Sequence, residues 1–114
     1  MPLLKITTNK DHDQTLVGDF LKQASATVAE ILGKPERYVM IGFEHNPHML
    51  FAASNDPLAF LELKSIGLPE DQTRQLSQAL CRLMEQQLAI PTERIYIEFS
   101  GAERHLWGWN AATF

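Results

Sequence analysis

The sequence predicts an α/β (α+β) fold in which a duplicated βαβ unit forms a four-stranded mixed sheet with two helices on one face. Segments whose apolar residues alternate, as in strands, flank two segments whose apolar residues have helical spacing. Residues 35–43 also align with residues 91–99 when one gap is allowed, which indicates an internal duplication. Because βαβ crossovers are right-handed, both helices are expected on the same face of one sheet. The 114 residues fit a single domain, 1–114.

The first half contains a strand, a helix and a second strand. Residues 2–8 alternate weakly and are rich in β-branched side chains, which predicts a strand. Residues 14–32 follow a polar turn, and their apolar residues form a helical stripe: Leu16, Phe20, Ala24, Val28, Ile31 and Leu32. Gly33-Lys34-Pro35 ends this helix, because glycine suits a left-handed cap and proline cannot continue a helix. Residues 38–44 predict the next strand, and residues 49–53 a short one.

The second half repeats this plan. Residues 58–66 predict a strand, and residues 67–71 predict a helix start with a proline and acids in its first turn. The apolar stripe of the helix consists of Leu76, Leu80, Leu83, Met84 and Leu88, and Pro91 ends it. Residues 94–100 predict the last strand, in which Ile95, Ile97 and Phe99 face one way. The tail, residues 101–114, is rich in glycine and aromatic residues.

The sheet face away from the helices is expected to be bare. We expect Tyr38, Met40, Leu4 and Ile6 or their neighbours on it, a set too apolar to remain in water. An exposed apolar sheet face predicts a bound partner or self-association.

The composition excludes several classes of protein. Lys and Arg number 10 against 14 Asp and Glu, a formal net charge of −4, so a strongly basic nucleic-acid surface and a polybasic membrane anchor are excluded. The single cysteine, Cys81, excludes an internal disulfide and a zinc site built on several cysteines. No signal peptide or membrane-length apolar run is visible, so we expect a soluble cytoplasmic protein. Secretion by an unconventional route would leave no trace in the sequence.

Pro2 is the first candidate for chemistry. When Met1 is removed, the chain begins with a secondary amine, and an α-amino group has a pKa of about 7.7–8.0 in peptides. Burial and a neighbouring cation lower that pKa further, which makes the amine a workable general base. Proline at position two is also common in proteins where it has no function.

Two further segments could bind an anion. Lys34 could hold a carboxylate or an enolate, or it could simply complement the C-terminus of the first helix. The backbone N–H groups of Ser65-Ile66-Gly67 could bind an anion, or this segment could only end a strand.

The remaining reactive and aromatic residues have structural interpretations. His45 and His48 are separated by an Asn-Pro turn rather than a helix turn, so we interpret them as surface histidines and predict no metal site. Cys81 lies beside an apolar helix stripe and is interpreted as a packing residue. The aromatic residues near the C-terminus form a core, an interface or an apolar wall for an aromatic ligand: Tyr96, Trp107, Trp109 and Phe114.

Taken together, these residues resemble the macrophage migration inhibitory factor (MIF) family of the tautomerase superfamily. Matching stretches are spread over essentially the whole chain, and the resemblance rests on their order and spacing. They are Pro2 after Met1, Thr8-Asn9, Gly33-Lys34-Pro35 with Tyr38, Met49-Leu50-Phe51 with Ser54, Ser65-Ile66-Gly67, Arg94-Ile95-Tyr96-Ile97, Gly108-Trp109-Asn110 and Thr113-Phe114.

The resemblance implies a homotrimer with sheets inside, helices outside and three active sites at subunit interfaces. It implies that Pro2 is catalytic base and then acid in the keto–enol tautomerisation of a small aromatic α-keto or enol acid such as phenylpyruvate, and in the isomerisation of dopachrome analogues. It implies no cofactor and no metal. Lys34 and the N–H of Ile66 would hold the substrate, Tyr96 of a neighbouring subunit would line the pocket, and Phe114 would add to its rim.

Ser65, Glu98 and Trp107 are also assigned to the pocket. The chain departs from the family pattern at three places. Glu98 replaces an asparagine frequent in animal members, and it would repel an anionic substrate or raise the pKa of Pro2. Trp107 replaces a smaller apolar residue and is expected to narrow the pocket mouth. Residues 57–61 replace the family's Cys-x-x-Cys stretch, so its thiol–disulfide activity is expected to be absent.

Two alternatives to a tautomerase stay open. One is a non-catalytic, cytokine-like signalling protein that keeps the fold, with receptor binding expected only if the host is an animal or interacts with one. The other is a ligand-binding module without chemistry.

Overall fold

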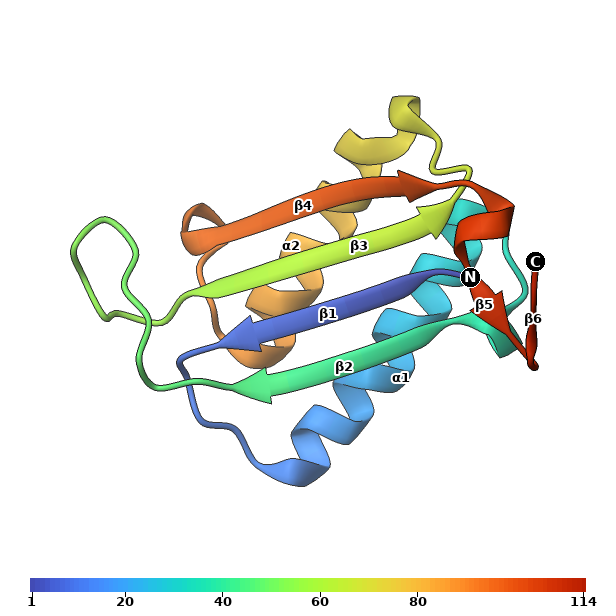
Figure 1. The fold of residues 1–114 in the computed structure, drawn as a ribbon. Coiled ribbons are helices and arrows are strands. Elements are labelled where there is room, and N and C mark those ends of the chain that lie inside the picture. The colour runs from blue at the N-terminus through green and yellow to red at the C-terminus, as the bar shows by residue number, and fades with distance from the viewer.

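The fold is one four-stranded sheet with two α-helices on one of its faces, seen in a computed structural model that describes all of residues 1–114 (Figure 1). The strands are β1 (Leu3–Thr8), β2 (Met40–His45), β3 (Ala59–Ile66) and β4 (Ile95–Ala102), and the helices are α1 (Gln14–Leu32) and α2 (Thr73–Leu88). The strand order is β2-β1-β3-β4; β1 is parallel to β2 and antiparallel to β3, which is parallel to β4. The predicted fold class, with its duplicated βαβ unit, is confirmed.

The helix ends follow the local chemistry of the sequence. The Asp13 side chain accepts a hydrogen bond from the N–H of Thr15 at the start of α1, and Gly33 ends that helix at φ +63°. Helix α2 ends earlier than predicted, because Ala89 already adopts a left-handed conformation at φ +56°. Short 3-10 helices then follow Pro35 and Pro91, so the duplication extends to the turns that lead into β2 and β4.

The segment between β2 and β3 is a long loop that projects from one end of the sheet (Figure 1). The short strand predicted at 49–53 does not form. Only one isolated bridge, between Phe51 and Ser54, is present, and Ala52 and Ala53 between them have positive φ values. The chain therefore reverses direction where an extended segment was expected.

The core lies between the sheet and the helices. Leu4, Ile6, Leu61 and Leu63 are fully buried on the helix-covered face of β1 and β3. The helices pack Phe20, Ala24, Val28, Leu76, Leu80, Met84 and Leu88 against them. Each large apolar side chain buried in this way contributes about 1.5–3 kcal/mol to the stability of the fold. Neither helix is long and apolar enough to span a membrane.

The face of the sheet away from the helices differs from the expectation. Leu4 and Ile6 lie in the core and not on this face, and Tyr38 belongs to a 3-10 helix at the sheet end. Met40, 68% exposed, is on the bare face as expected. Charged side chains occupy its centre, because Lys5 lies opposite Glu62 across the β1–β3 ladder. The bare face is thus a mixed charged and apolar surface, since residues at alternate positions along a strand point to opposite faces.

Candidate active site

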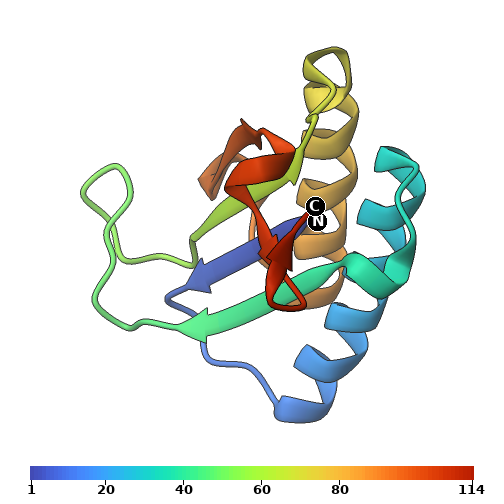
Figure 2. The same cartoon turned by 45° about the vertical axis from the view of Figure 1, so that its right-hand side comes forward.

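A cavity of about 390 Å³ lies at the end of the sheet where β1 begins. It is where the two ends of the chain meet, beside the short tail strands β5 (Gly108–Trp109) and β6 (Ala112–Thr113) (Figure 2). Its lining includes Pro2, Tyr38, Met40, Trp107, Trp109 and Phe114. No acidic side chain lines it, so the cavity suits an apolar or anionic ligand.

Three aromatic rings form one wall of this cavity. Trp109 and Phe114 stack with ring centroids 5.3 Å apart and planes 12° apart. Tyr38 meets both rings edge-on, at 5.4 Å from Trp109 and 5.6 Å from Phe114. The tail is held in place because the N–H of Phe114 donates to the carbonyl of Trp107 at 3.1 Å. Offset and edge-to-face contacts of this kind stabilise a rigid wall.

The N-terminal amine lies at the base of the cavity. The Met1 amine donates to the Tyr38 carbonyl at 2.9 Å, and Pro2 itself is buried. Burial lowers the pKa of this amine, and the charge of Lys34 lowers it further. The N–H of Met40 donates to the Pro2 carbonyl at 3.0 Å, which continues the β1–β2 ladder to the chain end. The amine therefore stands at a fixed place with reduced affinity for a proton.

Lys34 is positioned by the end of α1. Its N–H donates to the Ala29 carbonyl at 3.0 Å, a bond made where Gly33 turns the chain. Its Nζ donates to the Ile66 carbonyl at 3.1 Å and links α1 to the end of β3. Ser65 is fully buried, and its hydroxyl donates to the same carbonyl at 3.3 Å. Ser65 does not line the cavity of its own chain.

Tyr96 and Glu98 lie away from the Pro2 cavity of their own chain. The ladders pair Tyr96 with Phe60 and Phe60 with Thr7. Thr7 is five residues along β1 from Pro2, about 17 Å at the usual rise per residue. Tyr96 instead contacts Phe51, with ring centroids 4.7 Å apart, in a separate apolar pocket of about 290 Å³. One chain alone therefore does not place Tyr96 beside Pro2.

Arg94 has a positioning role that the sequence did not reveal. Its guanidinium donates to four backbone carbonyls, of Phe51, Ser54, Asp56 and Pro57, at 3.0–3.1 Å. These bonds fold the β2–β3 loop onto the start of β4, where Tyr96 lies. Tyr38 and Arg94 end the two equivalent 3-10 helices, so the internal duplication is one signal for this pair, beside the stretches that carry the family resemblance.

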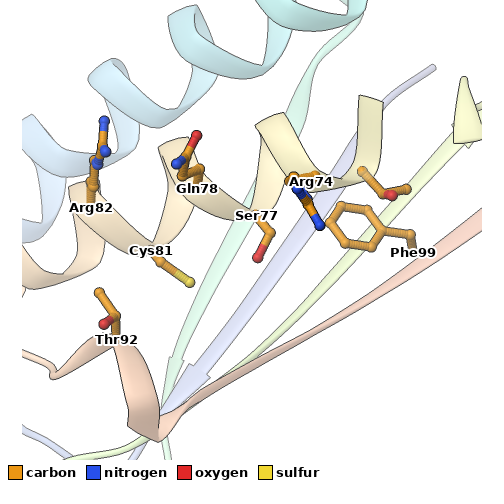
Figure 3. Close-up of a pocket in the computed structure, with 8 residues that line it drawn as sticks. Arg74, Ser77, Gln78, Cys81, Arg82, Thr92 and Phe99 are labelled. Carbon is orange, nitrogen blue, oxygen red and sulfur yellow. The ribbon is translucent and has the colours of Figure 1, made fainter. Parts of the chain in front are cut away.

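A larger groove, about 630 Å³, lies along α2 and is lined by Arg74, Ser77, Cys81, Arg82 and neighbouring side chains (Figure 3). Burial raises the pKa of the Cys81 thiol, and Glu85 adds to the rise against a lowering hydrogen bond with Ser77. A thiol that resists deprotonation is a poor nucleophile. Cys81 also packs against the core cluster, as the sequence predicted.

The histidines do not form a metal site with their neighbours. His45 bonds through Nε2 to the Asn9 carbonyl at 3.2 Å, and His48 starts a turn by donating its N–H to the Asn46 side chain at 2.9 Å. No three His, Cys, Asp or Glu side chains gather in a way that could hold a metal ion.

Comparisons with known proteins show the family of the chain. A sequence model of the family described as macrophage migration inhibitory factor (MIF) matches residues 1–114. The chain is 39% identical over 115 residues to the MIF homolog of Brugia malayi, covering 100% of this chain and 99% of that protein. It is 33% identical over 115 residues to MIF of Mus musculus, with the same coverage.

Solved structures give the same result. The crystal structure of the MIF homologue from Prochlorococcus marinus superposes with a TM-score of 0.93 at 38% identity, covering 98% of both chains. The structure of MIF from Trichinella spiralis gives a TM-score of 0.89 at 35% identity, covering 98% of this chain and 99% of that one. The chain therefore belongs to the macrophage migration inhibitory factor family.

Proposed function

We propose that this chain, after removal of Met1, is a keto–enol tautomerase of phenylpyruvate-type and dopachrome-like substrates, with Pro2 as general base and acid. The observation that carries the proposal is the position of Pro2, buried at the base of an aromatic-walled cavity with Lys34 acting on the chain's amine. Removing Met1 places the secondary amine of Pro2 at this base. The two causes that lower the pKa of the Met1 amine, burial and Lys34, then act on the Pro2 amine.

The reaction needs one group that moves a proton between carbon and oxygen. A neutral Pro2 amine takes a proton from the carbon beside the keto group and returns it to the enolate oxygen. Lys34 attracts the substrate carboxylate and the developing enolate charge. The substrate ring lies against Tyr38, Trp109 and Phe114. No cofactor takes part in these steps.

The proposal includes a homotrimer in which each site is completed by a neighbouring chain. Tyr96, 66% exposed and at the far end of the sheet, is available to line the Pro2 cavity of a neighbour. Glu98 lies on the exposed side of the same strand, two residues further on. A neighbour's Glu98 near Pro2 would repel an anionic substrate or raise the pKa of the Pro2 amine, and either effect would lower catalytic efficiency.

The test removes the secondary amine. Pro2→Gly, prepared so that the introduced glycine is confirmed as the N-terminal residue, is expected to lose phenylpyruvate tautomerase activity by a factor of about 10² or more, the usual range for a general base. A form that retains Met1 is expected to lose activity similarly, because its amine is displaced from Pro2. Initial rates of enol–keto conversion, followed by ultraviolet absorbance, give both results.

The control is a substitution that leaves the site intact. Arg82→Gln changes an exposed charge on α2, away from Pro2, and is expected to keep wild-type activity. Wild-type turnover by Pro2→Gly would contradict the proposal. An intact oligomer with an inactive wild-type chain would favour the signalling alternative instead.

A further inference from the structure

Arg37 is a cation at the Pro2 cavity that makes no ion pair within the chain. It lines the cavity from the 3-10 helix Glu36–Tyr38 and is exposed. The ion pairs present, Lys64–Glu62 and His105–Glu103, do not involve it. Its guanidinium makes no hydrogen bond within the chain, so its five N–H donors are available to a ligand.

The guanidinium is nevertheless held in a defined place. Its Cζ lies 4.7 Å from the centroid of the Tyr38 ring, within the range of a cation–π contact. The same ring contacts Trp109 and Phe114 edge-on. Arg37 thus continues the aromatic wall as a charged rim, and its planar donor fork matches the geometry of a carboxylate.

Arg37 and Lys34 are cations with different surroundings. The Lys34 Nζ bonds to the Ile66 carbonyl, and Lys34 acts electrostatically on the terminal amine. Arg37 is not among the causes of that amine's lowered pKa. Lys34 is thus the cation that acts on the terminal amine, and Arg37 is a second cation, which lines the cavity beside the Tyr38 ring.

We propose that Arg37 is a specificity-determining residue and that the site favours aromatic 2-keto acids with a second anionic group at the end of the ring remote from the keto acid. This inference rests on the proposed function, because it assumes that Lys34 holds the keto-acid carboxylate. The second anion binds the free guanidinium of Arg37, and the ring between the two anions lies against the aromatic wall.

The first test compares phenylpyruvate with 4-carboxyphenylpyruvate. Wild-type protein is expected to have the lower KM for the carboxylated substrate. Arg37→Gln is expected to raise that KM by a factor of about three to ten, the range of a partly solvated charge-assisted contact, and to leave kcat unchanged. Its KM for phenylpyruvate is expected to change less than about twofold. Arg37→Lys should restore only part of the difference, since an ammonium lacks the planar fork.

Arg82→Gln is the matched control, because it removes an exposed arginine outside the cavity. It is expected to leave both KM values unchanged. The difference between the two substrates should also shrink at high salt, because the rim of the cavity is accessible to counterions. Equal changes in both KM values on Arg37→Gln, or no change in either, would overturn the inference.

A binding measurement separates this inference from the proposed function. The only two tryptophans, Trp107 and Trp109, both line the cavity, so intrinsic fluorescence reports its occupancy without turnover. Terephthalate is expected to bind more tightly than benzoate, and Arg37→Gln should abolish the difference. If phenylpyruvate is not converted but this difference is found, the second-anion site holds and the tautomerase proposal fails. If conversion is found and terephthalate shows no dependence on Arg37, the tautomerase proposal holds and this inference fails.

Discussion

Lys34 combines two electrostatic effects in one side chain. Its charge disfavours protonation of the N-terminal amine, and in the proposed mechanism the same charge attracts the anionic substrate. The bond from Nζ to the Ile66 carbonyl limits the freedom of a long side chain, so less entropy is lost when a substrate binds. Burial is the larger cause of the lowered amine pKa, so Lys34 adjusts a value that the cavity mainly sets.

The pH dependence of kcat/KM in Lys34→Met separates the effect of Lys34 on the amine pKa from the effect of burial. Removing the cation leaves burial in place, so the pKa of the amine should rise part of the way towards its ordinary value. Since the neutral amine is the base, kcat/KM increases as pH rises through this pKa. The ascending limb of kcat/KM against pH should therefore move to higher pH in the variant. Lys22→Met, on the exposed side of α1, should leave the limb in place. A limb unmoved by Lys34→Met would contradict this role.

The sequence identified several residues of the cavity and offered Trp109 and Phe114 as part of an apolar wall, but it did not place Tyr38 in that wall. Pro2, Lys34, Trp107 and Phe114 were singled out by position, by the end of a helix or by resemblance, and all but Lys34 line the cavity directly. Tyr38 was placed on a strand face, whereas it packs against Trp109. A ring contact between residues so far apart in the chain depends on where the tail folds back, and no local pattern encodes that.

At the scale of elements, the spacing of apolar residues was enough to find the four strands of the main sheet and both α-helices, but not the short tail strands β5 and β6. The pattern failed at residues 49–53, whose apolar side chains are not part of the core between the sheet and the helices. Arg94 shapes this segment, because its guanidinium donates to the carbonyls of Phe51 and Ser54, which also accept from each other's N–H groups. A side chain some 40 positions away thus decides the local backbone conformation.

Arg94→Met is expected to release this loop. Four charge-assisted bonds are lost while the carbonyls regain water, so we expect a loss of about 2 kcal/mol in the free energy of unfolding. The N–H groups of Phe51 and Ser54, which bond to each other's carbonyls, should exchange with solvent much faster. Denaturant melts and hydrogen exchange measure the two effects. Arg74→Met, an exposed arginine on α2, serves as control. Unchanged exchange at residues 51–57 would show that the loop is held by other contacts.

At the scale of the whole molecule, the residues of the proposed site are divided between two ends of the sheet. Pro2 lies at one end, and Tyr96 lies on an edge strand at the other. A cyclic assembly that brings the two ends of neighbouring chains together would complete each site. The charged centre of the bare face, where Lys5 lies opposite Glu62, would then surround a wet interior rather than a second apolar core.

Mixing two defective chains tests this division. Pro2→Gly and Tyr96→Ala chains are each expected to have low activity in a homotrimer. After denaturation and refolding of an equal mixture, about a quarter of the sites should combine an intact Pro2 with an intact Tyr96. Activity should therefore return to about a quarter of the wild-type value, while either chain refolded alone stays inactive. No recovery in a mixture that sediments at about three times 12.9 kDa would rule out shared sites.

The meeting of Met1 and Phe114 at one cavity has a practical consequence for handling the protein. An affinity tag fused to either end would place the tag residues next to the junction in or against the proposed binding site. A tagged preparation would then give a false negative in a substrate screen, even if its fold were undisturbed. Material for such a screen is best made without extensions, with both terminal masses verified before any ligand is added.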